Sequence, residues 1–134
     1  MSTNSLDSMI AIFESRPYWG PELQRQFEHT NVTLREFRSV GDLSVSIVGF
    51  GTSLIVLDLD AALVDCLKWL GSGNSEHLLR LPIIAIGSSA TAELEWLLRE
   101  AGVTVFLPDM ITGEELAKLC RRQLGIVRKH KQSS

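Results

Sequence analysis

Short apolar runs alternate along the chain with segments in which apolar residues recur at helical spacing. "MIAIF" (9–13), "SLIVL" (53–57) and "LPIIAI" (81–86) are nearly continuous in apolar residues, which is typical of strands covered on both faces of a parallel sheet. "VTLREF" (32–37) carries two charged residues and "VTVFL" (103–107) is short, so we expect these two at the sheet edges. The pattern predicts five strands, three of them central.

A segment of helical period follows each strand, and its apolar residues fall on one face. The positions are Leu23 and Phe27; Val40, Leu43, Ile47 and Phe50; Leu63, Cys66, Leu67 and Leu70; Leu94, Leu97, Leu98 and Ala101; and Leu116, Leu119, Cys120, Leu124 and Val127. Ser39 with Asp42, and Thr112 with Glu115, have the spacing of capping boxes. Because strand–helix–strand crossovers are right-handed, this (βα)5 order predicts an α/β fold, a doubly wound parallel sheet in a three-layer sandwich.

Composition suits one compact domain, since the 134 residues are 45% hydrophobic with a mean hydropathy of +0.12. The 13 basic and 16 acidic side chains give a net charge of −3, so no general attraction to nucleic acid or anionic membranes is expected. No apolar run approaches the roughly 18 residues that a membrane span requires, and the N-terminus has no secretory signal. We therefore expect a cytoplasmic protein without nucleic-acid or membrane partners.

We expect a flexible N-terminus over residues 1–8, the domain over residues 9–127, and a basic tail or linker over residues 128–134. The tail leaves open whether the chain is complete or the front of a longer protein. Cys66 and Cys120 are too few and too far apart for a disulfide framework or a zinc site. Their helices should cover opposite faces of the sheet, so both are expected to be reduced, buried thiols.

Three carboxylates are predicted at the carboxyl ends of the central strands. Asp58 ends the third strand, Asp60 follows it, and Glu14 ends the first. In doubly wound sheets the ligand crevice lies outside this edge, between the first and third strands. A structural role is the alternative, in which Asp60 caps the helix that begins near Ala61 and Asp58 is a solvated loop acid.

Other kinds of chemistry are disfavoured. "FESRPYWG" (13–20), after the first strand, places bulky side chains where a glycine-rich phosphate loop would lie. His29, His77 and His130 are scattered, and no Ser or Cys nucleophile has a recognisable context. A mononucleotide-binding protein of this fold therefore ranks lower.

From about Met9 to Leu124 the sequence resembles the receiver domain of two-component response regulators. "LIVLDLDAALVDCLKWL" resembles the family's third strand, phosphoacceptor loop and third helix, "LPIIAIGSSA" its fourth strand, and "EAGVTVFLPDMITGEEL" its fifth strand and last helix. The resemblance implies a flavodoxin-like five-stranded sheet in the order 2-1-3-4-5. It also implies that Asp58 is the phosphoacceptor and that the backbone carbonyl of Asp60 joins a magnesium shell.

The metal site departs from the family pattern. The acidic pair that ends the first strand in receivers reads Phe13–Glu14 here, so an aromatic ring replaces one carboxylate. Magnesium needs hard oxygen ligands. Glu14, Asp58 and Asp60 remain as weak candidate ligands, and we expect no cofactor, with Mg²⁺ disfavoured.

The phosphoryl contacts depart as well. The Thr or Ser that ends the fourth strand in receivers is Gly87 here, with Ser88 and Ser89 as candidate stand-ins. The Lys that ends the fifth strand is Asp109. Two unit charges about 5 Å apart interact by roughly 3 kcal/mol at an effective dielectric of about 20, so an inward Asp109 would repel a phosphoryl group. An outward Asp109, with Arg16 or Arg38 supplying positive charge, would leave phosphorylation disfavoured but open.

The first hypothesis is therefore a phosphorylation-independent pseudo-receiver, a non-enzymatic signalling module that binds a kinase or an output partner. The alternative is a phosphorylatable receiver that takes a phosphoryl group from a histidine kinase onto Asp58 with Mg²⁺. Its only catalysis would be its own phosphotransfer.

A candidate interaction surface lies on "TAELEWLLREAG" (91–102), where about 100° per residue carries Trp96 away from the buried face, beside Arg99. The alternative is that an adjacent loop covers Trp96. On the last helix, Lys118, Arg121 and Arg122 project from the non-core side. The resemblance implies a homodimer through the fourth helix, fifth strand and fifth helix, with Trp96 as an anchor.

Overall fold

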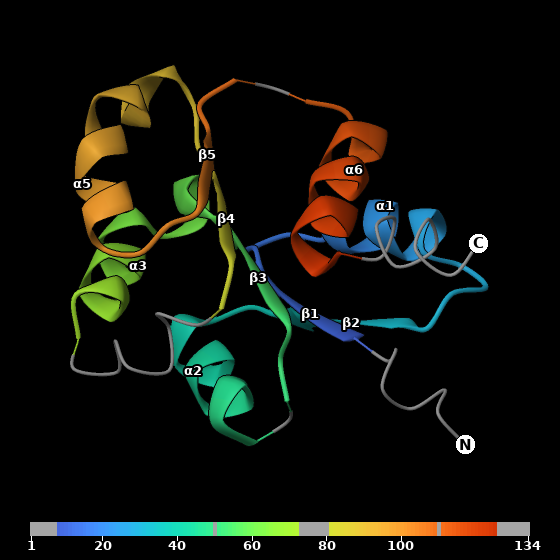
Figure 1. The fold of residues 1–134 in the computed structure, drawn as a ribbon. Coiled ribbons are helices and arrows are strands. Elements are labelled where there is room, and N and C mark those ends of the chain that lie inside the picture. Colours follow the sequence, from blue (N-terminus) through green and yellow to red (C-terminus); the bar gives the residue numbers. More distant parts are fainter. Residues whose placement is uncertain (1–7, 50, 73–80, 110, 126–134) are drawn as a thin grey trace.

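The computed structural model describes residues 8–49, 51–72, 81–109 and 111–125 as a three-layer α/β sandwich (Figure 1). Its strands are β1 (Ser8–Phe13), β2 (Val32–Phe37), β3 (Leu54–Asp58), β4 (Ile83–Ile86) and β5 (Val105–Leu107). Its α-helices are α1 (Trp19–Gln26), α2 (Val40–Gly49), α3 (Leu63–Leu70), α5 (Glu95–Glu100) and α6 (Gly113–Leu124), and two short 3-10 helices are η2 (Leu59–Ala61) and η3 (Ser89–Leu94).

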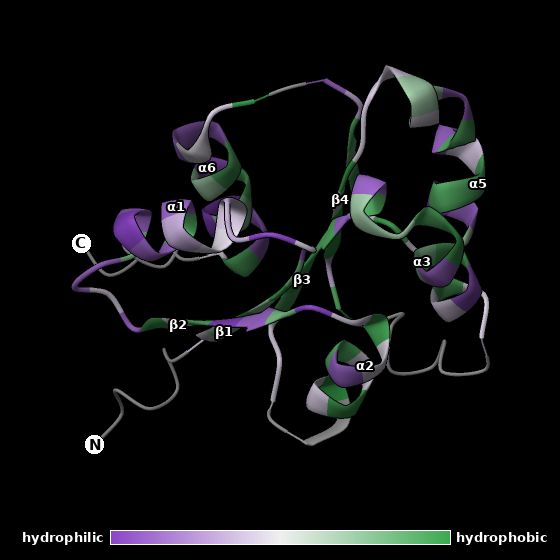
Figure 2. Ribbon diagram, turned by 180° about the vertical axis from the view of Figure 1, so that it is seen from behind, coloured by the Kyte–Doolittle hydropathy of each residue, from purple (hydrophilic) through white to green (hydrophobic). Residues whose placement is uncertain are grey.

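The strands form one parallel sheet in the order β2-β1-β3-β4-β5. This confirms the predicted order, with the charged β2 and the short β5 at the edges. The apolar runs have the expected burial, because every residue of β4 and all but the last residue of β3 are buried. In Figure 2 the hydrophobic colour accordingly concentrates on the central strands and on the helix sides that face them.

Two apolar layers separate the helices from the sheet. One layer contains Phe13, Leu57 and Leu98 and lies under α2, α3 and α5. The other contains Ile12, Val56 and Leu116 and lies under α1 and α6. Alternate residues of each central strand enter opposite layers, because side chains of a strand point alternately to its two faces.

The segment before β5 differs from the predicted single helix. Ser89–Leu94 forms the 3-10 helix η3, and regular α-helix begins only at Glu95. Ser88 caps η3 through a side-chain bond from the Ala90 amide, which tightens this turn. Within α5 only Leu98 is buried, and Leu97 has 38% of its surface exposed, so its assignment to the buried face was wrong.

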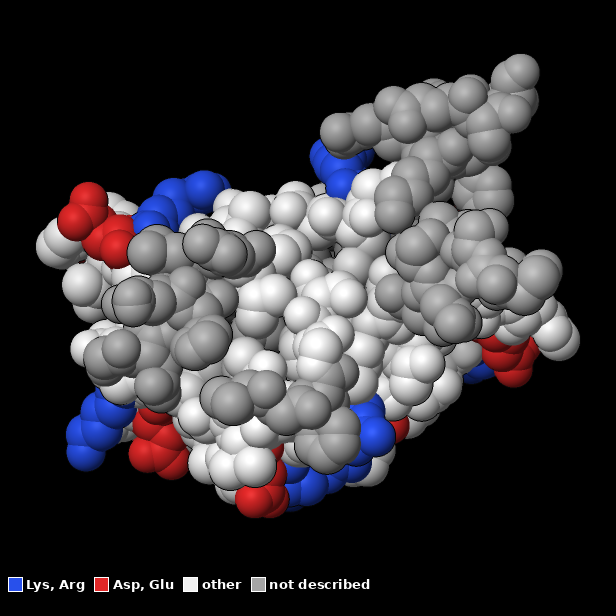
Figure 3. All heavy atoms as spheres, turned by 60° about the horizontal axis from the view of Figure 1, so that its bottom comes forward, with Lys and Arg blue, Asp and Glu red and all other residues white. Residues whose placement is uncertain are grey.

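Several sequence-based expectations fall partly or wholly outside the described residues. These are the flexible N-terminus, the basic tail, Phe50, His77, Val127 and His130. Among the helices that the structure describes, none is both long enough and apolar enough to cross a membrane. Figure 3 turns the lower end of Figure 1 forward, and there the described charged side chains stand mainly around an uncharged centre.

Both cysteines are free and buried, Cys66 in the layer under α3 and Cys120 in the layer under α6. This confirms their predicted placement on opposite faces of the sheet. Burial raises the pKa of each thiol to about 12, against 9.0 for an unperturbed cysteine.

We expect the folded protein to resist thiol-specific reagents at mildly alkaline pH, because the thiolate is the reactive form. After denaturation without reductant, titration should find two thiols. Rapid modification of the folded protein, or no thiol after denaturation, would contradict this placement. Stability should fall as the pH rises from 9.0 toward about 12, because the unfolded thiols ionise first.

Candidate functional site

The carboxyl ends of β1 and β3 bring two predicted acids to one edge of the sheet. Phe13 pairs in register with Leu57, so Glu14 and Asp58 are the next residues along two neighbouring strands. Burial raises the pKa of Asp58 above the usual 3.8, and the negative charges of Asp60 and Glu14 add to this effect. The three acids thus share one electrostatic environment at this edge.

Glu14 is buried inside the β1–α1 loop, with 1% of its surface exposed. Its Oε1 accepts a hydrogen bond from the Trp19 amide at 2.9 Å, and its Oε2 accepts bonds from the amides of Gly20 at 2.9 Å and Tyr18 at 3.2 Å. Tyr18, the residue before α1, provides no side-chain cap of its own. Glu14 therefore caps α1 from a distance, and both of its oxygens are engaged.

Glu36 and Arg38, at the end of β2, pack against the β1–α1 loop and the start of α1. The Glu36 carboxylate lies against Gly20, with its oxygens 2.6 Å from where a Cβ would stand, so only glycine fits there without displacing it. Arg38 donates to Glu36 Oε1 at 3.0 Å and to the backbone carbonyl of Glu14 at 3.4 Å. Arg38 thereby ties the end of β2 to the start of the loop.

Asp58 caps its own 3-10 turn, since its Oδ1 accepts the Asp60 amide at 3.2 Å. The capping role thus belongs to Asp58, where the structural alternative placed it on Asp60. Asp60 is exposed, and its Oδ1 accepts a bond from the Ser88 hydroxyl at 3.4 Å. Asp58, Asp60 and Ser88 therefore come together, whereas the exposed Ser89 makes no side-chain hydrogen bond with the residues that the structure describes.

A side chain at position 87 has no room. A Cβ on Gly87 would collide with Thr91 Oγ1 and come within 3.1 Å of the Phe106 ring. Thr91 is buried, accepts the Ser88 amide at 2.9 Å and donates to the Ser88 carbonyl at 3.1 Å. The Thr91 hydroxyl thus fills the space beside the end of β4. The sequence pattern did not identify Thr91 as a residue of this edge. The one signal for it is Gly87, because a glycine directly after a strand can mark a place where another group packs closely against the backbone.

The residue that stands in place of the family's lysine is exposed. Asp109 follows β5 and Pro108, and it forms no ion pair with another described residue. Arg16 is also exposed, while Arg38 is held by Glu36 and the Glu14 carbonyl. The edge therefore has no buried cation beside Asp58 among the described residues.

The donor set at this edge does not fit a magnesium ion. Phe13 is part of an apolar layer, and three amides already occupy the oxygens of Glu14. Within the described ranges no group of three His, Cys, Asp or Glu side chains could hold a metal. Asp58 and Asp60 alone provide two carboxylates, each with one oxygen already hydrogen-bonded, and a Mg²⁺ ion held by so few carboxylates depends on phosphate and water oxygens for its other ligands.

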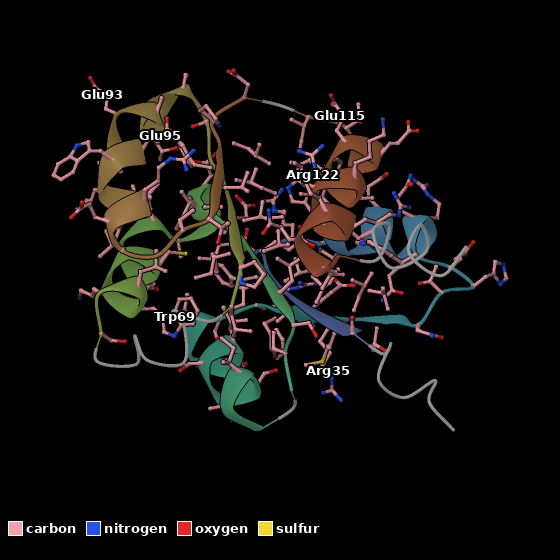
Figure 4. All side chains as sticks on the ribbon, in the orientation of Figure 1. Arg35, Trp69, Glu93, Glu95, Glu115 and Arg122 are labelled. Carbon is pink, nitrogen blue, oxygen red and sulfur yellow. The ribbon has the colours of Figure 1, made fainter. Side chains whose placement is uncertain are left out.

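The predicted interaction residues flank β5. Trp96 is 68% exposed, so the described chain does not cover it. Arg99 pairs with Glu95 at 3.0 Å, and it also donates to the Thr104 carbonyl at 3.4 Å. Figure 4 shows Glu93 and Glu95 on one side of β5, with Glu115 and Arg122 on the other.

The basic residues of α6 do not share one role. Lys118 and Arg122 are exposed. Arg121 instead turns to α1, where it donates to the Gln26 carbonyl at 3.1 Å and lies 5.1 Å from the centre of the Phe27 ring. Arg121 therefore stabilises the packing of α6 on α1.

No protein-family model matches this sequence, and no curated protein matches it either. Solved structures do match. The Francisella response regulator 1452 receiver domain is 12% identical at a TM-score of 0.74, covering 90% of this chain and 99% of that one. A CheY-like response regulator receiver domain protein from Methanospirillum hungatei JF-1 is 15% identical at a TM-score of 0.73, covering 92% and 98%.

A response regulator receiver modulated diguanylate cyclase from Pelobacter carbinolicus is 20% identical at a TM-score of 0.63, with 93% of this chain and 98% of that chain covered. These identities are low, and the match extends over nearly the whole length of each chain. The predicted resemblance is thus confirmed at the level of the fold: the chain has the flavodoxin-like fold of response regulator receiver domains.

Proposed function

We propose that this domain is a pseudo-receiver, which takes part in two-component signalling by binding a protein partner and without being phosphorylated. The observation that carries the proposal is the engagement of Glu14. A carboxylate that accepts three backbone amides cannot offer the same lone pairs to a metal ion without opening the start of α1.

Two further features support the proposal. The hydroxyl expected at the end of β4 is absent, and Thr91 fills its place while bonded on both sides to Ser88. The cation expected after β5 is replaced by the exposed Asp109, so no cation at this position would neutralise a dianionic phosphoryl group at Asp58. Both features weaken the binding of a phosphoryl group at Asp58.

One observation favours the alternative of a phosphorylatable receiver. Asp58 is only half-buried at the correct edge, and Asp60 and Ser88 lie beside it. Opening of the Asp58–Asp60 bond would free the carboxylate for attack on a histidine kinase's phosphoryl group.

Incubation with Mg²⁺ and a small phosphodonor such as acetyl phosphate, followed by intact-mass measurement, separates the two functions. We expect no added phosphoryl group on the wild-type protein beyond the level seen with Asp58→Asn. Stoichiometric modification that Asp58→Asn abolishes would establish the alternative instead.

The partner surface that we propose centres on Trp96 and Arg99, on α5 beside β5. Glu93 of η3 and Glu95 and Glu100 of α5 are exposed, and Lys118 and Arg122 of α6 are exposed as well. Figure 4 shows Arg122 across β5 from Glu93 and Glu95. A second copy related by a two-fold axis could place the acids of one α5 opposite the bases of the other α6. We therefore propose a homodimer in the cytoplasm, whose remaining surface meets a kinase or an output protein.

Trp96→Ala should weaken self-association by roughly 2 kcal/mol or more while the fold survives, because a large exposed aromatic side chain is a frequent interface anchor. Sedimentation velocity over a concentration series measures the effect. Tyr18→Ala is the matched control, since Tyr18 is an exposed aromatic residue that lies just before α1, away from α5 and β5. Equal association of both variants and the wild type would remove the claim.

A further inference from the structure

A shallow cavity, open to solvent, lies between the starts of α2 and α3, beside the carboxyl ends of β1 and β3. Its volume is about 370 Å³, at the small end of the range of about 300–1,000 Å³ typical of ligand sites. Ser39, Val40 and Gly41 line one side, and Ala61, Ala62, Asp65 and Lys68 line the other, with Phe13, Ser15 and Arg38 completing the wall. Asp58 does not line this cavity, so it is separate from the candidate phosphorylation site.

Two charged side chains of the cavity wall, Asp65 and Lys68, form no ion pair with the residues that the structure describes. Glu22 and Arg25, three residues apart, form an ion pair at 2.6 Å, and Glu95 and Arg99, four apart, form one at 3.0 Å. Asp65 and Lys68 on α3 are three residues apart, like Glu22 and Arg25, yet no ion pair joins them to each other or to another described residue. Both side chains are exposed and line the cavity.

The rest of the wall divides into an apolar part and a polar part. Val40, Ala61 and Ala62 provide small apolar surfaces, while the hydroxyls of Ser15 and Ser39 and the guanidinium of Arg38 provide polar groups. Ser39 already accepts the Asp42 amide at 3.1 Å, and Arg38 is held by Glu36. Lys68 is therefore the cation most available to a bound molecule.

The geometry points to a binding site for a small organic anion in this cavity. The anionic group would lie between Lys68 and Arg38, a compact apolar body would contact Val40 and Ala61, and a hydroxyl or amino group would donate to Asp65. Such a ligand would bridge the starts of α2 and α3 and stabilise the domain by mass action. This inference does not depend on whether Asp58 is phosphorylated.

The probe is para-hydroxybenzoate, which combines a carboxylate, a compact ring and a hydroxyl group, and its neutral methyl ester is the matched control ligand. Titration followed by two-dimensional amide NMR should show saturable shifts at Val40, Gly41, Ala61 and Ala62 with the acid. The ester should bind at least about fivefold more weakly, because it lacks the charge that Lys68 and Arg38 attract. Added salt should weaken binding of the acid.

Two variants test the assigned residues. Lys68→Gln should weaken binding of the acid by about fivefold or more. Gly41→Asp places a carboxylate in the cavity wall, yet an acid in the first turn of a helix is favourable and a Cβ at Gly41 meets no close neighbour. It should abolish binding without loss of stability. Lys118→Gln, on the opposite helix layer, is the control and should bind like the wild type.

Three results would overturn the inference. One is the absence of saturable shifts at these amides up to the solubility limit of the probe. Another is equal binding of the acid and its ester, which would mean that the cavity does not recognise charge. The third is unchanged binding by both Lys68→Gln and Gly41→Asp.

Discussion

Glu14→Ala is expected to lower the free energy of unfolding by about 3 kcal/mol, because it leaves the buried amide of Gly20 and the partly buried amides of Tyr18 and Trp19 without their acceptor. Glu14→Gln should cost about half as much, because it keeps one carbonyl acceptor but loses the charge that strengthens these bonds. Urea denaturation measures both values.

Glu114→Ala is the matched control, because Glu114 is exposed in the first turn of α6. Its effect should stay within about 0.5 kcal/mol. If Glu14→Ala instead left stability unchanged and abolished a Mg²⁺-dependent rise in melting temperature, Glu14 would be a metal ligand and not a cap. The capping role and the metal-binding role of this residue thus give opposite results.

Gly87→Thr, which restores the side-chain hydroxyl of the family pattern, should destabilise the domain by about 3 kcal/mol, because its Cβ would overlap Thr91 Oγ1 and crowd Phe106. The double variant Gly87→Thr/Thr91→Ala removes the overlapping hydroxyl. It should be more stable than Gly87→Thr alone, with a coupling of about 2 kcal/mol between the two sites.

Thr91→Ala alone should cost about 1–2 kcal/mol, because the Ser88 amide loses its buried acceptor. This single variant completes the double-mutant cycle. Additive effects of the two substitutions would show that Thr91 does not occupy the space beside Gly87. Thermal or urea unfolding of the four proteins provides the measurement.

The fold was predictable because the strands leave a strong local signal. The nearly continuous apolar runs "SLIVL" and "LPIIAI" are typical of strands buried on both faces of a parallel sheet, and the charges of "VTLREF" favour an edge. The weaker predictions concern η3 and α5. There the local bond from Ala90 to Ser88 competes with regular α-helix, and an apolar period alone does not reveal such a turn.

The site was predictable in position but not in role. The topology places Glu14 and Asp58 at one edge, and this follows from strand order alone. The bonds that engage Glu14 depend on how residues 15–18 return to α1, and the fit of Thr91 over Gly87 depends on the tilt of η3. Neither feature can be read from the spacing of residues along the sequence, because both depend on tertiary contacts.

Under the proposed function, these contacts would explain how a receiver fold keeps its shape without being phosphorylated. Carboxylates and hydroxyls at the carboxyl edge accept hydrogen bonds from backbone amides of the loops, and they thereby contribute to the stability of this edge. The fold then needs no metal ion or phosphoryl group to order this edge. A domain of this kind would present one constant surface to its partners.

Titration with Mg²⁺ and beryllofluoride, a mimic of the phosphoryl group, tests the central claim most directly. Tryptophan emission provides the readout, because the Trp19 amide bonds to Glu14 and its ring lies beside Tyr18 at the start of α1. We expect no saturable change in emission, and the same response from wild type and Asp58→Asn. A saturable change that requires both Mg²⁺ and Asp58 would show that the edge still binds a phosphoryl group, and it would contradict a phosphorylation-independent function.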